Sequence, residues 1–410
     1  MDSPAPVPIT IMKFGGTSVG DAEAFRRVIE IAAQTRSRSE PVILVVSAMS
    51  GVTDALLECA RCAVRGQDEV FRSSAESLRQ QHFTVANLLI KDPALSQAVK
   101  ADIDGFIAEL LNFCQALRVL GEASPRALDA VSALGERLSV RLLEGALRQA
   151  DIPAQSVNAA RLIVTDSAFQ SAHPDLSASR KKTRQVLMPL IRKGILPVVT
   201  GFVAANAQGV TTTLGRGGSD YSAAILGAVL PAVQVIIWTD VDGVMSADPR
   251  LVPQAHTITE LSYRETAELA FYGAKVLHPK TIRPVIDAGI PLRVRNTFNP
   301  SHPGTLISAQ THSKNDGIIK AVTAIPDLAL VTIEGRGMLG VPGVAARTFA
   351  AVAATGTSVP LITQASSEQT ICFAVPLAAA ELVCRALENE FCAEIARHDI
   401  DRVWSIGTVV

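Results

Sequence analysis

Three glycine-rich turns each follow a stretch that is predicted to be a strand, and each of them contains a charged residue. The turns are KFGGTS (13–18), LGRGGSD (214–220) and GRGMLG (335–340). Glycine lets backbone N–H groups approach an anion, and a following helix adds the positive end of its dipole. A single glycine pair is more often an ordinary tight turn. Lys13 beside the first turn, and Arg216, Ser219 and Asp220 within the second, instead favour a site for phosphate or carboxylate groups.

Other known phosphate- and metal-binding patterns are missing or incomplete. The chain has no G-x-x-x-x-G-K-[ST] P-loop and neither the H-R-D nor the D-F-G motif of protein kinases. GRGMLG matches the dinucleotide fingerprint G-x-G-x-x-G, but the next predicted strand, SVPLITQ, lacks the acid that would bind a ribose. The segment 239–250 holds three aspartates that could bind a metal or a ribose, yet it does not fit an EF-hand. A kinase would therefore need a different phosphate cradle.

The segments around the first two turns alternate between strand and helix. ITIMKF and PVILVVSA are predicted strands, and each is followed by a turn and a helical pattern. The second is continuously apolar, which is typical of a parallel strand covered on both faces. The sequence thus predicts an α/β domain over residues 8–298. Within it we expect a helical elaboration from Gln67 to Leu120 and one long helix over Ser124–Gln149, which opens with Ser-Pro.

A smaller second domain is predicted over residues 317–410, after the turn-rich segment NTFNPSHPGT. Its predicted order is strand, helix, strand, strand, helix, strand. This order indicates a two-layer α+β unit of about 80 residues.

Composition narrows the class of protein. The 410 residues are 48% hydrophobic and carry a net charge of −1, which favours a globular protein and argues against a nucleic-acid binder. The chain has no apolar run long enough to span a membrane and no signal-peptide pattern at its start, so we expect a cytoplasmic protein. Cys59 and Cys62 form a C-x-x-C within a helical pattern, and we interpret them as packed thiols, with no protein-bound metal expected.

A set of longer motifs, taken in order along residues 11–295, resembles the aspartate kinase family of the amino-acid-kinase superfamily. The motifs are KFGGTSVGD, VVSAMSGVTD, ALGERLS, TGFVAAN, TTTLGRGGSDYSA, WTDVDGVMSADPR and AKVLHPKTI. Residues 328–410 resemble the ACT domain through which such kinases are regulated. The resemblance implies a three-layer sandwich around a mainly parallel sheet, plus a small α+β ACT-type domain.

The resemblance also implies an activity, namely ATP plus L-aspartate giving ADP plus 4-phospho-L-aspartate, with Mg2+ bound to the nucleotide. The implied catalytic residues are Lys13 and Asp220. The implied aspartate-binding residues are Ser47, Thr53, Glu136, Arg216 and Ser219. The implied ATP-binding residues are Lys13, Gly15, Gly16, Thr239, Asp240, Arg250, Lys275 and Val276. Met245 departs from the family, because many relatives have Tyr at this position.

Regulation by an effector amino acid, threonine or lysine, is implied by the ACT-type domain. The candidate effector residues are Met338, Gly343, Ser358, Val359 and Gln364. An open sheet edge in this domain favours pairing between copies, so we expect a homodimer or a higher homo-oligomer. The family normally carries two ACT units, whereas only one is recognised here.

Two alternative functions remain open. One is a kinase for another small acidic amino acid, such as glutamate, although AKVLHP and the ACT-type domain argue against it. The other is an amino-acid-sensing relative that has lost catalysis. The presence of Lys13, Glu136, Arg216 and Asp220 does not indicate such a loss.

Overall fold

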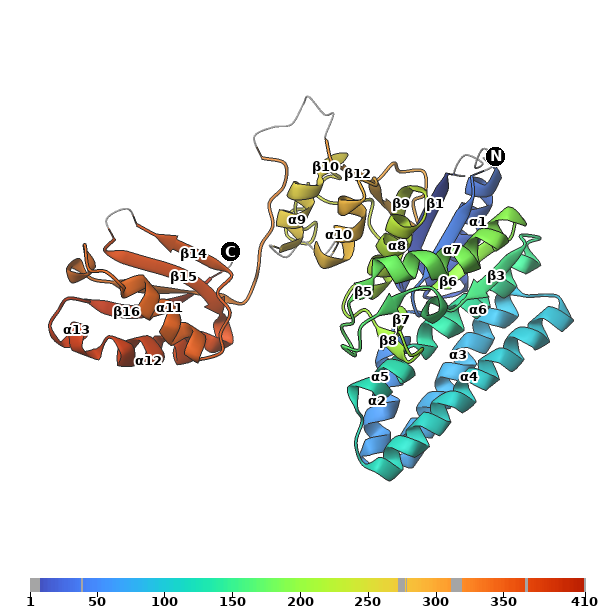
Figure 1. Cartoon of the computed structure of the whole chain (residues 1–410), viewed down its shortest axis with the longest axis horizontal. Coiled ribbons are helices and arrows are strands. Elements are labelled where there is room, and N and C mark those ends of the chain that lie inside the picture. The colour runs from blue at the N-terminus through green and yellow to red at the C-terminus, as the bar shows by residue number, and fades with distance from the viewer. Residues whose placement is uncertain are drawn as a thin grey trace. The chain divides into compact units, whose positions relative to one another are not determined.

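The computed structural model describes residues 8–37, 40–271, 277, 279–310, 319–365 and 368–408. The chain divides into two compact units, Met1–Val322 and Thr323–Val410 (Figure 1). Each unit is described by itself.

The larger unit holds most of the helices and strands. Its helices are α1 (Ala22–Ser37), α2 (Val52–Val64), α3 (Asp68–Leu89), α4 (Pro93–Leu120), α5 (Pro125–Ser132), α6 (Leu134–Gln149), α7 (Leu176–Arg192), α8 (Gly218–Val229), α9 (Tyr263–Phe271) and α10 (Pro279–Asp287). Its strands are β1 (Ile9–Phe14), β2 (Val42–Val46), β3 (Ala154–Val157), β4 (Val164–Thr165), β5 (Pro174–Asp175), β6 (Leu196–Thr200), β7 (Val203–Asn206), β8 (Thr211–Thr213), β9 (Ala232–Thr239), β10 (Glu260–Ser262), β11 (Leu292–Asn296) and β12 (Thr305–Ser308). Short 3-10 turns are η1 (Thr17–Val19) and η2 (Ala159–Arg161).

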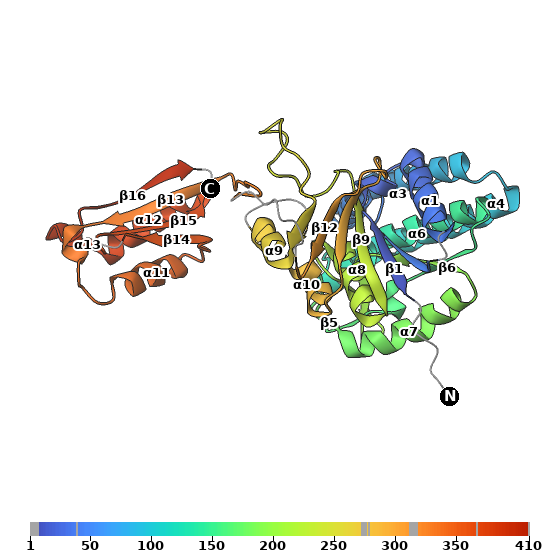
Figure 2. The same ribbon diagram turned by 90° about the horizontal axis from the view of Figure 1, so that it is seen from above.

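The central sheet has eight strands in the order β10-β12-β11-β9-β1-β2-β6-β3. Neighbouring strands are parallel except for β11 and β12. Alternate side chains serve different layers: Met12 and Phe14 pack with α1 to α4 and α6, whereas Ile9 and Ile11 pack with α7, α8 and α10. Figure 2 shows helices on both sides of the sheet. The predicted three-layer α/β fold is confirmed.

A smaller sheet has the order β5-β4-β7-β8, and its strand β8 directly precedes the second glycine turn in the chain. Strands β7 and β8 are antiparallel, and the chain runs from β8 through residues 214–217 into α8. This sheet therefore anchors the start of the glycine turn.

The predicted long helix over Ser124–Gln149 is divided in two. Ser124 caps α5 as expected, because its Oγ accepts a hydrogen bond from the backbone N–H of Ala127 at 3.3 Å and Pro125 occupies the first turn. The chain then changes from α5 to α6 at Ala133, which keeps right-handed helical backbone angles. The two helices form one nearly continuous run.

The C-x-x-C cysteines lie on α2 and point into the apolar layer that covers the sheet. Both Cys59 and Cys62 are buried free thiols. Burial raises the pKa of Cys59 to about 11. A thiol held protonated in this way is a poor nucleophile and a poor metal ligand.

The smaller unit has the predicted strand-helix-strand-strand-helix-strand order. Its elements are β13 (Leu328–Glu334), η3 (Arg336–Met338), α11 (Val344–Ala354), β14 (Leu361–Gln364), β15 (Thr370–Pro376), η4 (Leu377–Ala379), α12 (Ala380–Glu390), α13 (Cys392–Ala396) and β16 (Arg402–Thr408). The antiparallel sheet runs β14-β15-β13-β16, so β14 and β16 are its edges. Val352 of α11, Leu387 of α12 and Phe373 of β15 share one core, which makes the unit two-layered.

The larger unit continues beyond residue 298, where the sequence predicts its end. Strand β12 pairs with both β10 and β11, so the central sheet needs residues 305–308. Within the described part of the chain, no helix combines the length and the apolar character that crossing a bilayer requires.

Two helical glycines should respond oppositely to alanine. Gly105, in the middle of α4, has nothing within 4 Å of the position of a Cβ, whereas a Cβ on Gly145 of α6 would lie 2.7 Å from Val99 Cγ2 and 2.8 Å from Ile90 Cδ1. We expect Gly105→Ala to raise the free energy of unfolding by about 1 kcal/mol through helix propensity. Gly145→Ala should lower it by roughly 1–3 kcal/mol through overpacking. Urea denaturation measures the free energy of unfolding of both variants. Equal effects of the two substitutions would contradict the difference in packing between Gly105 and Gly145.

Candidate active site

A cavity of about 260 Å3 lies where β1 and β2 end and α8 begins. In open α/β sheets ligands bind at the carboxyl ends of the strands, and this volume suits a small metabolite. The lining residues are Lys13, Ser47, Thr53, Glu136, Phe202, Gly215, Gly217, Gly218, Ser219 and Asp220. The cavity thus brings together every predicted catalytic and aspartate-binding residue except Arg216.

Lys13 and Asp220 form an ion pair across the cavity wall. The Nζ of Lys13, near the end of β1, lies 2.7 Å from Oδ1 of Asp220, in the first turn of α8. The two side chains are only 12% and 16% exposed, so water and salt screen this pair less than a surface pair. A Cβ on Gly15 would lie 3.3 Å from this Nζ, so glycine keeps the space beside the amine open.

Glu136 lies in the first turn of α6 and is 3% exposed. Its Oε1 accepts a hydrogen bond from the backbone N–H of Ala48 at 3.2 Å, while its buried Oε2 has no hydrogen-bond partner. Burial raises the pKa of Glu136 to about 8. Gly135 makes this placement possible, because a Cβ there would lie 2.8 Å from that of Ala48. A buried carboxylate with a free oxygen is suited to receive a cation.

The second glycine turn wraps one side of the cavity. Gly215 and Gly217 have φ of +76° and +70°, left-handed values that favour glycine. Ser219, at the start of α8, is almost completely buried. Arg216 lies between the two glycines but is exposed and does not line the cavity.

Two of the predicted ATP-binding residues lie at the end of the neighbouring strand, β9. Thr239 ends this strand and donates a hydrogen bond through its hydroxyl to Oδ1 of Asp240 at 3.2 Å. The first glycine turn is tied to the same place, because the backbone N–H of Gly15 donates to the carbonyl of Trp238 at 3.3 Å. Gly16 also packs closely, since a Cβ on it would lie 3.1 Å from the carbonyl oxygen of Ala48.

Arg250, another predicted ATP-binding residue, does not line the cavity. The guanidinium of Arg250 is 72% exposed and pairs with Asp248, with 2.6 Å between Nη2 and Oδ2. Lys275 and Val276 lie outside the residues that the structure describes. Met245, which departs from the family, forms a β-bridge with Thr257. The hydroxyl of Thr257 donates to the sulfur of Met245 at 3.6 Å.

Four lining residues were not expected from the sequence: Phe202, Gly215, Gly217 and Gly218. The glycines belong to a turn that the sequence does identify, but nothing in it shows that their backbone forms a wall. Phe202 follows β6 and has φ of +61°, which is unusual for a bulky residue. Its neighbour Gly201 packs against the side chain of Ser219, where a Cβ would lie 2.5 Å from Oγ. Only the motif TGFVAAN could have drawn attention to Phe202.

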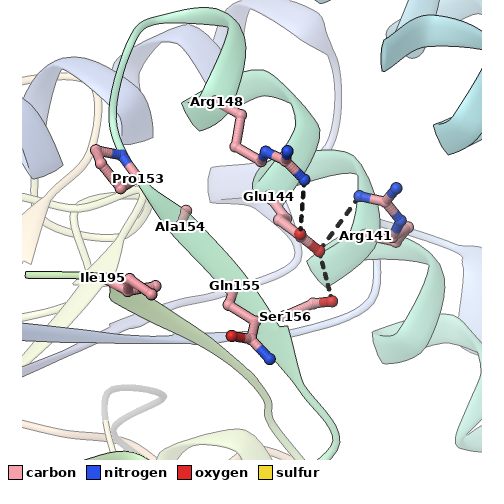
Figure 3. A pocket seen from close by; sticks show the side chains of 8 residues that line it. All are labelled: Arg141, Glu144, Arg148, Pro153, Ala154, Gln155, Ser156 and Ile195. Atoms are coloured by element: carbon pink, nitrogen blue, oxygen red, sulfur yellow. Dashed lines mark hydrogen bonds and ion pairs between the residues drawn. The ribbon is translucent and has the colours of Figure 1, made fainter. Parts of the chain in front are cut away.

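A larger cavity, of about 540 Å3, lies beside α6 and the edge strand β3 (Figure 3). The carboxylate of Glu144 accepts a hydrogen bond from the Ser156 hydroxyl at 2.6 Å and pairs with Arg141 at 3.2 Å and Arg148 at 3.6 Å. The charged side chains that line this cavity therefore form ion pairs with one another. The smaller cavity, with the free oxygen of Glu136, is the better candidate for the active site.

In the smaller unit, the predicted effector residues lie in different environments. Gly343 precedes α11 with φ of +92°, and Ser358 and Gln364 are exposed. Val359 is half-buried against the core of the unit. Met338 lies inside that core with 3% of its surface exposed, so its side chain packs there rather than facing solvent.

Two family models match the chain. The model of the amino acid kinase family matches residues 8–296, and a model of the ACT domain matches residues 331–391. The first match covers more than half of the chain.

A curated plant relative matches almost the whole chain. The bifunctional aspartokinase/homoserine dehydrogenase 1 of Zea mays, named as chloroplastic, is 38% identical over 398 residues, which is 96% of this chain and 43% of the relative. The chain therefore spans less than half the length of this bifunctional protein.

Two solved structures of Escherichia coli aspartokinase III match over 97% of this chain and 85% of theirs. The complex with lysine and aspartate, described as the T-state, has 30% identity and a TM-score of 0.77. The complex with aspartate and ADP, described as the R-state, has 29% identity and a TM-score of 0.74. With the family model and the gathered motif residues, these matches show that the chain belongs to the aspartokinases, within the amino acid kinase family.

Proposed function

We propose that this chain transfers the terminal phosphoryl group of ATP to the side-chain carboxylate of L-aspartate, giving 4-phospho-L-aspartate. The observation that carries the proposal is the cavity in which a buried carboxylate with a free oxygen, Glu136, faces the same space as the Lys13–Asp220 pair. The E. coli relative, whose structures contain aspartate and ADP, supports this choice of substrates.

Each charged end of the amino acid has a candidate partner. The α-ammonium group binds Glu136, which then gains the cation that its Oε2 lacks. The α-carboxylate binds Arg216, whose planar guanidinium can donate two parallel hydrogen bonds once it turns toward the cavity. The rest of the substrate is held by the hydroxyl groups of Ser47, Thr53 and Ser219.

The reaction needs positioning and charge neutralisation more than proton transfer. The nucleophile is the side-chain carboxylate of aspartate, which is ionised at neutral pH, so no protein base is required. Lys13 stabilises negative charge on the transferring phosphoryl group. The N–H group of Gly16 assists it, whereas that of Gly15 already donates to the carbonyl of Trp238. Asp220 orients the amine of Lys13 through the 2.7 Å contact.

The nucleotide extends from Lys13 toward the end of β9, where Thr239 and Asp240 lie. Arg250, Lys275 and Val276 complete the proposed ATP site. Among the described residues, no group of three acidic, histidine or cysteine side chains is placed to hold a metal. Mg2+ that enters bound to the nucleotide stays a prediction. When bound, the ion would offset charge on the phosphates, and Asp220 would help to orient water bound to it.

The smaller unit is the proposed effector site, with threonine or lysine as the ligand. The E. coli relative in complex with lysine and aspartate supports an amino-acid effector. The N–H groups at the start of α11, after Gly343, would bind its carboxylate, and carbonyls of residues 358–364 would bind its ammonium group. A homodimer or higher oligomer, in which edge strands pair, and a cytoplasmic location both stay predictions.

A hydroxylamine-trapping assay tests the activity and the role of Lys13 together. With ATP and Mg2+, the wild type should form an acyl phosphate from L-aspartate and far less from L-glutamate or N-acetyl-L-glutamate. Lys13→Met should lower turnover by roughly 10³-fold, because transition-state charge loses its partner. Lys181→Met, at an exposed position on α7, is the matched control and should keep full activity. Near-normal turnover of the Lys13 variant would rule out the proposed role.

The raised pKa of Glu136 predicts that aspartate binding releases a proton. With a pKa of about 8, Glu136 is mostly protonated in the empty site at pH 7 and must ionise to bind an ammonium group. Calorimetry at pH 7 in buffers of different ionisation enthalpy should therefore report on the order of one proton released per site. Affinity for aspartate should rise with pH up to about 8 and then level off.

Glu136→Gln provides the control for this titration. It should abolish the proton release and weaken aspartate binding, while ATP affinity stays close to wild type. A binding enthalpy that does not depend on the buffer in the wild type would show that Glu136 is already ionised.

The exposed edge strand β14 provides a test of the proposed dimer. Ile362 on β14 is 54% exposed, and Leu382 on α12 is 56% exposed. If β14 edges pair, Ile362→Lys should raise the dimer dissociation constant by roughly 10–100-fold and reduce inhibition by threonine or lysine. Leu382→Lys should change neither. Sedimentation velocity and activity assays compare the two variants, and equal behaviour would argue against pairing through β14.

A further inference from the structure

Asp129 is a buried acid on α5 that the proposed mechanism does not use. It is 1% exposed and does not line the cavity of about 260 Å3. Its carboxylate accepts hydrogen bonds from the backbone N–H of Gln170, at 3.1 Å to Oδ1 and 3.0 Å to Oδ2. It also accepts from the N–H of Thr213 at 3.0 Å and from the Thr213 hydroxyl at 2.8 Å. These donors carry no charge, so the carboxylate is held entirely by neutral groups.

These bonds connect Asp129 to the glycine turn by two routes. Thr213 is the last residue of β8 and leads directly into residues 214–218. Gln170 supports the same turn from beside it, because a Cβ on Gly215 would lie only 2.9 Å from the carbonyl oxygen of Gln170. The N–H of Ala172 donates to the carbonyl of Thr213 at 2.9 Å, which links the segment that follows Gln170 directly to β8.

Asp129 also belongs to the helical run that carries Glu136. The N–H of Ala133 donates to the carbonyl of Asp129 at 3.1 Å, and the N–H of Arg137 donates to the carbonyl of Ala133 at 3.4 Å. Glu136 follows Asp129 by seven positions, about 10 Å along a helical run. This run of two successive helices thus carries both Glu136, which lines the cavity, and Asp129, which accepts hydrogen bonds from residues beside the glycine turn.

We propose that Asp129 is a positioning residue that sets the distance between Glu136 and the glycine turn that leads into Asp220, and so makes the site select the length of its amino-acid substrate. The inference rests on the proposed function, in which Glu136 binds the α-ammonium group, while Asp220 holds Lys13 beside the side-chain carboxylate that accepts the phosphoryl group. L-aspartate and L-glutamate differ by one methylene group, and discrimination of that size needs walls that cannot move apart.

The test measures KM for aspartate, KM for ATP and the preference for aspartate over glutamate. Asp129→Ala should raise KM for aspartate by about 10–100-fold, lower the aspartate preference by about 10-fold and leave KM for ATP within about 2-fold. Asp129→Asn keeps one acceptor oxygen and should be intermediate. Thr213→Val removes only the hydroxyl donor and should raise KM for aspartate a few-fold. This variant tests the inference if Asp129→Ala does not fold.

Glu144→Ala is the matched control, because Glu144 is another buried acid on the same helical run but faces the larger cavity (Figure 3). It should lower stability without changing KM for aspartate. A wild type that forms no acyl phosphate from aspartate would overturn the proposed function and this inference with it. An active wild type whose Asp129 and Thr213 variants keep its KM for aspartate and its aspartate preference would overturn the positioning role alone.

Discussion

The ion pair between Lys13 and Asp220 is the contact on which the candidate active site depends. It joins β1 to α8, two elements separated by about half of the chain, and neither side chain is well exposed. A partly buried charge that loses its partner is costly, so the two elements must stay together. The parallel sheet makes the contact possible, because the ends of β1 and β2 and the start of α8 meet at one edge.

Close backbone approach is the second requirement of this site. Glycine at 15 leaves room beside the Lys13 amine, glycine at 135 lets α6 approach Ala48, and glycine at 201 accommodates Ser219. Each of these positions joins different segments, so the three glycines bring strand, helix and turn within reach of one small ligand. A side chain at any of them would separate groups that the proposed chemistry needs close together.

The two buried carboxylates Asp129 and Glu136 lie on one helical run but differ in the hydrogen bonds that they accept, and therefore in the function that each can have. Asp129 receives hydrogen bonds on both oxygens from Gln170 and Thr213, which suits a structural clamp. Glu136 receives one from Ala48 and keeps Oε2 free, which suits binding of a cation. Burial raises the pKa of both groups, so the difference between them lies in their partners rather than in their exposure.

The sequence by itself determined the fold class, the strand that carries Lys13, the glycine turns and most of the residues around the cavity. The apolar runs of β2 and β1 report burial directly, since these signals are local. The tertiary structure alone decided the free oxygen of Glu136, the clamp at Asp129, the break at Ala133 and the position of Arg216 outside the lining. Those properties depend on partners far away in the chain: Ala48 lies 88 residues from Glu136, and Thr213 lies 84 residues from Asp129. A pattern of neighbouring residues carries no information about such contacts, because folding alone brings the partners together.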